Sequence, residues 1–184
     1  MKRILSALLV FCILFSLSAC KKEDTSSQSS GIDVEYYAEL GSMPECEYSL
    51  GQDVDTLKDK LEEIYNTDEE AVYNVVEGKS TVQIDSGAYQ YYYVKDKKSD
   101  GISYIVSFNK AFGFETGTVS VEISDALKEF KPVEEKLNDD NAFFVLGAPV
   151  GKVLKYKFSK NTVSFVFIND ALYATAIYKT NDWE

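Results

Sequence analysis

The sequence contains no histidine and only three cysteines among its 184 residues. Histidine is the commonest general base, metal ligand and pH-sensitive side chain, so its absence excludes every catalytic arrangement that is built on an imidazole. The sequence also lacks a glycine-rich phosphate loop and any pair of cysteines at the spacing of a metal site. We therefore expect a protein that is not an enzyme and that holds neither a metal nor another cofactor.

Basic residues are scarce relative to acidic ones, with 19 Lys and Arg against 30 Asp and Glu. Lys2 and Arg3 are the only charged residues among the first 19, so the rest of the chain has 17 basic residues, 30 acidic ones and a net charge of −13. Such an acidic surface repels the phosphates of nucleic acids and anionic lipid headgroups. We therefore expect no nucleic-acid partner and no membrane attachment by electrostatic attraction.

The N-terminal segment has the pattern of an export signal. A basic head, Lys2-Arg3, precedes an apolar run from Ile4 to Leu17 and the small residues Ser18-Ala19. The stretch Leu17-Ser18-Ala19-Cys20 resembles the lipobox of bacterial lipoproteins, in which the cysteine is lipid-modified and the chain is cut before it. The resemblance implies a signal peptide over residues 1–19 and an acyl anchor such as palmitate on Cys20.

Two other interpretations of this segment stay open. One is an uncleaved membrane helix, although the apolar run is shorter than the roughly 20 residues that span a bilayer. The other is an ordinary signal peptide without lipid, although a cysteine directly after Ser-Ala argues against it. With lipid on Cys20, we expect the protein on a cell membrane, facing outside the cytoplasm, at a Gram-positive cell surface.

The rest of the sequence divides into a tether and one domain. Residues 20–31 are polar and rich in serine, which predicts a flexible tether. Residues 32–184 have the length of a single domain. Cys12 leaves with the signal and Cys20 carries lipid, so Cys46 has no disulfide partner; it is either a reactive thiol or a small buried hydrophobe.

Hydrophobic periodicity predicts an α+β domain. Asp53 is the expected N-cap of an amphipathic helix with apolar residues at positions 54, 57, 61 and 64. A second helical segment is expected to begin at Ser124. Pro132 breaks or restarts it, and Val133 and Leu137 continue the helical spacing. Alternation and turn residues predict strands over Val34–Tyr37, Cys46–Ser49, Val72–Val76, Thr81–Ile84, Ala88–Val94, Ile102–Phe108, Ala111–Glu115, Val153–Phe158, Thr162–Ile168 and Ala171–Tyr178. The Val34–Tyr37 segment is either a short strand or an ordered lead-in to the domain.

The two halves of the domain resemble each other. Ser103–Val106 aligns with Ser164–Phe167, and Asn109–Phe112 aligns with Asn169–Leu172 after one gap. We therefore predict two repeats, over about residues 45–118 and 119–180, each a helix followed by an antiparallel sheet. The helices of both repeats should pack on one face of a mainly antiparallel sheet.

Alternation along the strands also assigns a side to each residue. Tyr104, Val106 and Phe165 fall on the face expected beneath the helices. The opposite face mixes aromatic and aliphatic side chains with small polar ones, so it is either a plain solvated surface or a docking surface. The candidate binding residues on this face are Tyr92, Ile105, Lys155, Lys157, Val166 and Tyr173.

Two short segments carry a resemblance to a known group of proteins. Leu50-Gly51-Gln52-Asp53 opens the first predicted helix, and Leu146-Gly147-Ala148-Pro149 precedes an aromatic strand. With the lipidated cysteine, the tether and the two helix-plus-sheet units, they resemble the β-lactamase inhibitor proteins and the SmpA/OmlA envelope lipoproteins over about residues 45–180. The resemblance implies a non-catalytic domain that meets another protein through its open sheet, and it does not imply inhibition of a β-lactamase.

Three functions are compatible with these features. The first is a membrane-anchored interaction module whose open sheet contacts another envelope protein. The second is a carbohydrate- or cell-wall-binding domain, because tyrosines between Tyr89 and Tyr93 can stack on sugar rings, although they can equally pack within a strand. The third is an enzyme that uses a carboxylate pair, which requires two Asp or Glu side chains that converge in a cleft.

Overall fold

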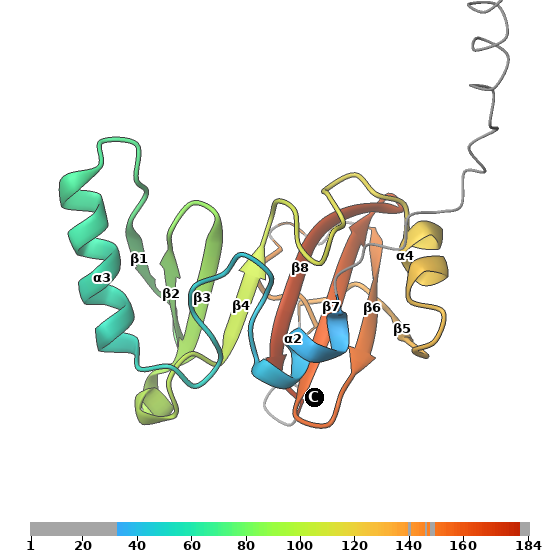
Figure 1. Ribbon diagram of the computed structural model, residues 1–184, viewed down its shortest axis with the longest axis horizontal. Helices are drawn as coiled ribbons and strands as arrows, with labels where there is room; N and C mark the ends of the chain where they lie inside the picture. Colours follow the sequence, from blue (N-terminus) through green and yellow to red (C-terminus); the bar gives the residue numbers. More distant parts are fainter. Residues whose placement is uncertain (1–32, 140, 146, 148–149, 181–184) are drawn as a thin grey trace, which may run out of the picture.

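A computed structural model describes residues 33–139, 141–145, 147 and 150–180 (Figure 1). Cys20, the predicted tether over residues 20–31, and Leu146, Ala148 and Pro149 lie outside the described residues. Within the described ranges, no helix is both long enough and apolar enough to cross a membrane.

The described residues form one eight-stranded sheet and a few short helices. The helices are α2 (Val34–Leu40), α3 (Val54–Thr67), the 3-10 helix η1 (Lys95–Asp100) and α4 (Ser120–Ala126). The strands are β1 (Asn74–Glu77), β2 (Thr81–Asp85), β3 (Tyr89–Val94), β4 (Tyr104–Ser107), β5 (Val133–Lys136), β6 (Gly151–Lys157), β7 (Asn161–Ile168) and β8 (Ala171–Lys179).

The strand order is β1-β2-β3-β4-β8-β7-β6-β5, and every neighbouring pair is antiparallel. α3 precedes the meander β1–β4, α4 precedes the meander β5–β8, and the last strands of the two meanders pair in the middle of the sheet (Figure 1). The prediction of an α+β fold is confirmed. However, β4 is the fourth strand of its meander and β7 is the third of its own, so aligning Ser103–Val106 with Ser164–Phe167 matches strands at different positions.

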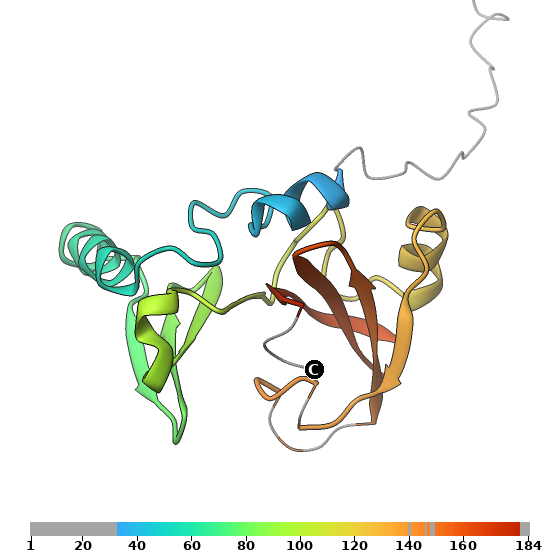
Figure 2. The same ribbon diagram turned by 90° about the horizontal axis from the view of Figure 1, so that it is seen from below.

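The helices α2, α3 and α4 cover one side of the curved sheet, its outer side in Figure 2. Their apolar residues enter one large core with side chains from β2, β3, β4, β6, β7 and β8. Phe165 at the centre of this core is fully buried, and its ring centroid lies 5.6 Å from that of Phe114 and 5.7 Å from that of Tyr156. The predicted position of Phe165 beneath the helices is therefore confirmed.

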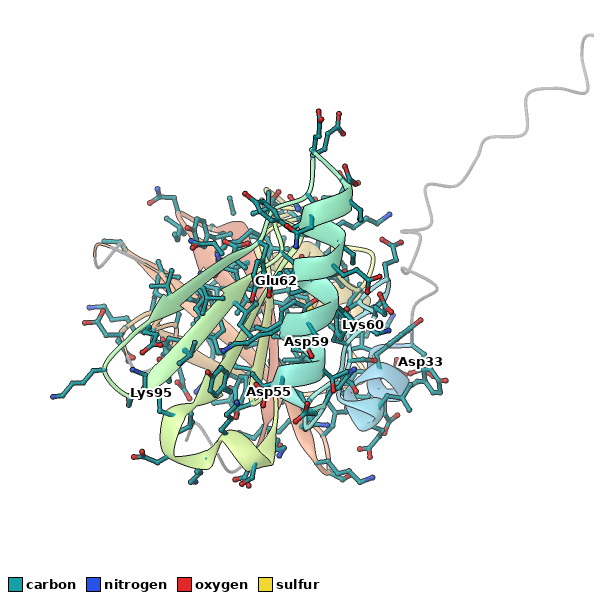
Figure 3. The ribbon with its side chains drawn as sticks, turned by 90° about the vertical axis from the view of Figure 1, so that its left-hand side faces the viewer. Asp33, Asp55, Asp59, Lys60, Glu62 and Lys95 are labelled. Atoms are coloured by element: carbon teal, nitrogen blue, oxygen red, sulfur yellow. The ribbon has the colours of Figure 1, made fainter. Side chains whose placement is uncertain are left out.

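α3 is amphipathic, as its sequence predicts. Val54, Leu57 and Leu61 are buried against the sheet, whereas Ile64, the fourth residue of the predicted stripe, is 44 % exposed. Figure 3 shows the opposite side of the helix, where Asp55, Asp59 and Glu62 are exposed. The apolar stripe therefore packs the helix on the sheet while the acidic face remains in water.

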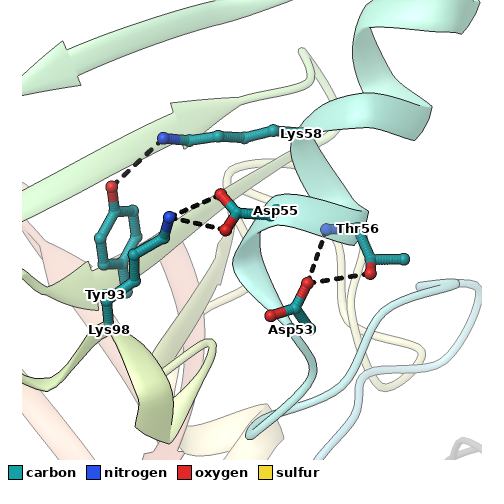
Figure 4. A network of polar contacts seen from close by, with 6 residues as sticks. All are labelled: Asp53, Asp55, Thr56, Lys58, Tyr93 and Lys98. Carbon is teal, nitrogen blue, oxygen red and sulfur yellow. Dashed lines mark hydrogen bonds and ion pairs between the residues drawn. The ribbon is translucent and has the colours of Figure 1, made fainter.

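The start of α3 is fixed by polar contacts (Figure 4). The Asp53 carboxylate accepts hydrogen bonds from the backbone N–H of Thr56 at 2.8 Å and from its hydroxyl at 2.9 Å, which confirms Asp53 as the N-cap. These bonds lower the pKa of Asp53. Nearby, Lys98 on η1 donates to both carboxylate oxygens of Asp55, at 2.6 and 2.7 Å, and thereby joins η1 to the first turn of the helix.

Two segments near the beginning of the domain are not the strands that alternation predicts. Residues 34–40 form α2, because Asp33 caps the helix by accepting from the N–H of Tyr36 at 2.9 Å and Gly41 ends it at φ 70°. The Cys46–Ser49 stretch lies in a loop, with a single bridge between Ser42 and Ser49. Cys46 is half-buried against the core, and burial raises the pKa of its thiol, which disfavours the reactive thiolate.

Two further predictions were wrong for local reasons. Ala111–Glu115 is a tight turn, in which Phe112 has φ 53° and Ala111 and Phe114 exchange backbone hydrogen bonds at 3.0 Å. The second helix runs from Ser120 to Ala126 and does not continue after Pro132. Residues 133–136 instead form the edge strand β5, because the proline stops helix formation and the following residues pair with β6.

The strand phase predicted for β4 was also wrong. Ile105 lies in the core beneath the helices, whereas Tyr104 and Val106 point to the other face of the sheet. All four residues of β4 are buried, so both faces of this central strand are apolar and alternation cannot distinguish them.

Candidate functional site

The face of the sheet opposite the helices, called here the concave face, lies on the inside of the curve in Figure 2. The loop between β5 and β6 reaches over this face on the side of the second meander. Its Phe143 and Phe144 pack on a cluster that includes Tyr92, Tyr104 and Tyr178. The face that the sequence predicts to be open is therefore partly covered.

The β5–β6 loop is fastened to the concave face by apolar packing and by a polar network. Its Ala142 and Val145 form a small cluster with Leu137 and with Val153 and Val166 of the sheet. The cluster closes over the half of the concave face that β6 and β7 provide.

The polar network centres on Asn141, Glu135 and Lys155. Asn141 donates from Nδ2 to Glu135 Oε2 at 3.2 Å, and the Lys155 ammonium lies 2.9 Å from the same oxygen. The hydrogen bond from Lys155 is the main reason why the pKa of Glu135 is lowered, with a further contribution from Asn141. Asn141 and Asn138 also exchange two 3.0 Å bonds between their backbone N–H groups and side-chain oxygens. The beginning of the loop is therefore held in place.

Next to the loop, the uncovered part of the concave face contains a pocket of about 560 Å³, called here the aromatic pocket. Strands β1–β3, the end of β4, the β5–β6 loop and β8 contribute to its lining. The lining residues are Val76, Gly78, Thr81, Gln83, Gln90, Tyr92, Phe108, Phe143, Phe144 and Tyr173. Its volume is within the range of about 300–1,000 Å³ that is typical of small-ligand sites.

The aromatic wall of this pocket is a series of rings in edge-to-face contact. Ring centroids are 5.0 Å apart for Tyr92 and Phe143, 5.7 Å for Phe143 and Phe144, 6.0 Å for Phe144 and Phe108, and 5.5 Å for Phe108 and Tyr173. Tyr173 reaches this wall at a β-bulge, because the pairing of β7 with β8 shifts register beside it. Bulges commonly redirect a side chain in this way.

The polar part of the pocket lining is uncharged. The Tyr92 hydroxyl donates to Gln90 Oε1 at 2.6 Å, and Gln90 Nε2 donates to Asp85 Oδ2 at 3.2 Å. Burial raises the pKa of Tyr92, and the Asp85 carboxylate raises it further, so the phenol stays protonated. The Gln83 side chain has no hydrogen-bond partner among the residues that the structure describes, and it is partly exposed in the lining.

The six candidate binding residues on the sheet fall into separate environments. Tyr92 and Tyr173 line the aromatic pocket. Lys155 and Val166 are on the concave face but are buried beneath the β5–β6 loop, and Lys157 is on that face and exposed. Ile105 lies on the opposite side of the sheet, in the core under the helices.

Several pocket residues were absent from the sequence-based candidates. Phe143 and Phe144 stand together in a segment without strand or helix periodicity, and adjacent aromatic residues in such a loop are a detectable signal. Gln83 and Thr81 give no comparable signal, because polar residues alternate with apolar ones in any half-exposed strand.

The lining limits the chemistry of the pocket. Its described residues include no Asp, Glu, Cys, Lys or Arg, so they offer no carboxylate pair for acid–base catalysis. In the described ranges as a whole, no group of three Asp, Glu or Cys side chains is placed to hold a metal ion. The arrangement is suited to binding through aromatic contact and neutral hydrogen bonds.

Comparison with known proteins found no match to this chain among protein families, curated proteins or solved structures.

Proposed function

We propose that this protein is a lipid-anchored, extracytoplasmic binding module, and that the aromatic pocket on its concave face is where it recognises a component of the cell envelope. The observation that carries the proposal is the pocket itself. Five aromatic side chains and two glutamines converge there, at the edge of a loop that is tied down by the Asn141–Glu135–Lys155 network. A preformed concavity with a few placed polar groups is the usual form of a binding site.

The direction in which the described chain begins supports the same function. α2 starts the described chain on the outer side of the sheet (Figure 2), whereas the residues that line the aromatic pocket belong to the concave face. A tether that enters through Asp33 therefore joins the domain away from the pocket. Under the proposed lipid anchor at Cys20, the pocket remains accessible while the protein is held at the membrane.

Site-specific photo-crosslinking in intact cells tests where the protein binds. A photoreactive amino acid replaces Tyr173, which is 39 % exposed in the pocket, or Tyr36, which is 55 % exposed on α2. We expect a specific adduct with an envelope component from position 173 and none from position 36. Equal adducts from both positions, or an adduct from position 36 alone, would place binding elsewhere on the domain.

The anchor is tested separately by Cys20→Ser. We expect the variant to leave the membrane fraction and to appear in the soluble extracytoplasmic fraction, with Cys46→Ser as the matched control that stays with the membrane. If the Cys20→Ser protein stays in the membrane fraction to the same extent as the wild-type protein, the lipid anchor is refuted. The evidence for the pocket is not affected by that result.

A further inference from the structure

The chemistry of the aromatic pocket narrows the class of ligand beyond the proposed function, on which this inference rests. We propose that the pocket binds an uncharged carbohydrate, with a sugar ring against the aromatic wall and its hydroxyl or acetamido groups hydrogen-bonded to Gln83 and Gln90.

The first step is the absence of charge among the described lining residues. The nearest carboxylate in the polar network, that of Asp85, already accepts from Gln90 Nε2 at 3.2 Å and from the N–H of Gly87 at 2.8 Å. A charged ligand would lose its hydration in this pocket without gaining an opposite charge, which is unfavourable. Anions are further disfavoured by the net charge of −13 on residues 20–184. The ligand should therefore be neutral.

The second step is the pair of glutamines. Gln90 accepts from Tyr92 and donates to Asp85, and these bonds fix the orientation of its amide but leave one N–H and one lone pair available. The Gln83 amide keeps its full capacity. Gln83 pairs in register with Tyr92, and Gln90 is two residues before Tyr92 on the same face of β3. The two glutamines are therefore diagonal neighbours, a relation that places their Cα atoms about 7–8 Å apart. Groups that both donate and accept, as sugar hydroxyls and acetamido groups do, can satisfy both amides at once.

The third step is the combination of these amides with the aromatic wall. A sugar ring has apolar C–H faces and a polar rim, so it can cover the rings of Tyr173, Phe108 and Phe143 while its rim faces the glutamines. A purely apolar ligand would leave the desolvated amides unpaired. A pocket of about 560 Å³ also matches a small ring better than the broad surface that two proteins need.

Isothermal titration calorimetry of the full-length protein tests this inference, in a detergent that carries no sugar headgroup. The neutral probes are tetra-N-acetylchitotetraose, which has acetamido groups, and cellotetraose, which has none. The third probe is tetragalacturonate, an anionic tetramer of similar size. We expect at least one neutral tetramer to bind and the anionic one not to bind.

Variants then locate the bound sugar. Gln83→Ala removes an amide that has no partner within the described protein, so it should fold normally and weaken binding about tenfold. Tyr173→Ala should weaken binding about fivefold to tenfold, and the matched control Tyr36→Ala on α2 should leave it unchanged.

Three results would overturn the inference. They are no binding of either neutral tetramer, equal binding of the anionic one, and binding that neither pocket variant weakens. If neutral sugars fail to bind while crosslinking from position 173 captures an envelope protein, the carbohydrate inference is overturned and the binding function stands. If position 173 captures nothing and the sugars do not bind, both fail.

Discussion

The substitution Glu135→Gln tests how firmly the β5–β6 loop is held over the concave face. Glutamine keeps the shape of the side chain and an oxygen that can accept from Asn141, but it removes the charge that faces Lys155. The Lys155 side chain is 7 % exposed and that of Glu135 is 38 % exposed. Exposed ion pairs contribute up to about 1 kcal/mol, and breaking a buried pair costs about 3–5 kcal/mol. For this half-exposed partner we expect the free energy of unfolding to fall by about 1–2 kcal/mol.

Urea denaturation followed by circular dichroism measures this change in unfolding free energy. In a thermal melt, the melting temperature should fall by about 2–8 °C. Glu134→Gln is the matched control, because Glu134 is the next residue on β5, is 63 % exposed and lies 3.9 Å from Lys152. Lys152 also lies 3.4 Å from Asp170, so it keeps a partner. We expect the control to change the unfolding free energy by less than about 0.5 kcal/mol. Equal effects of the two substitutions would refute the view that Lys155 depends on Glu135.

The pH dependence supplies a second test of the same contact. The hydrogen bond from Lys155 lowers the pKa of Glu135 below its ordinary value of 4.5 in the folded state. Its stabilising contribution is therefore complete above the pKa of the unfolded chain and is lost as the pH falls through the lower folded pKa. The difference in unfolding free energy between the wild-type protein and Glu135→Gln should thus be largest near pH 7. It should shrink as the pH falls through the lowered pKa of Glu135 in the folded state.

Other predictions test the strand phase and the backbone. Ile105→Ala should lower the free energy of unfolding by about 2–5 kcal/mol because Ile105 is fully buried beneath the helices, whereas Val121→Ala on the exposed side of α4 should change it by less than about 0.5 kcal/mol. Similar values for the two variants in urea denaturation would contradict the burial of Ile105 in the core. Gly101→Ala should cost about 1–3 kcal/mol more than Gly117→Ala: both glycines have positive φ, but only at position 101 would the new Cβ lie 2.5 Å from backbone atoms, those of Gly51 and Gln52. Equal losses of stability in thermal melts would show that strain at positive φ, and not the close backbone contact at position 101, determines the cost of the substitution.

The parts of the fold that were predictable from the sequence are those with a clear local cause. The helix after Asp53 has both a capping carboxylate and an apolar stripe, and each feature predicts it independently. The two-residue turn at Asn169-Asp170 was also predictable, because both residues adopt positive φ and Asn and Asp tolerate it. These signals operate within a few residues of the chain and need no knowledge of the rest.

The remainder depended on contacts that are distant in the sequence. Ile105 was assigned to the wrong face because β4 pairs with β3 and β8 in the middle of the sheet and is buried on both sides. The aromatic pocket could not be predicted as a site, since Gln83 and Phe143 are 60 positions apart and meet only through the curvature of the sheet and the position of the loop. Tyr92 was identified because it alternates with core tyrosines, and Tyr173 reaches the same pocket through a bulge that alternation does not predict.

Hydroxyl-radical footprinting of the protein in intact cell envelopes, compared with the purified protein, tests the central claim most directly. If the aromatic pocket is the recognition site, Tyr173, Phe143 and Phe144 should lose reactivity in envelopes, while Tyr36 and Tyr65, both exposed on the helical side, should react as they do in the purified protein. Protection of the helical tyrosines together with unchanged reactivity in the pocket would contradict the account.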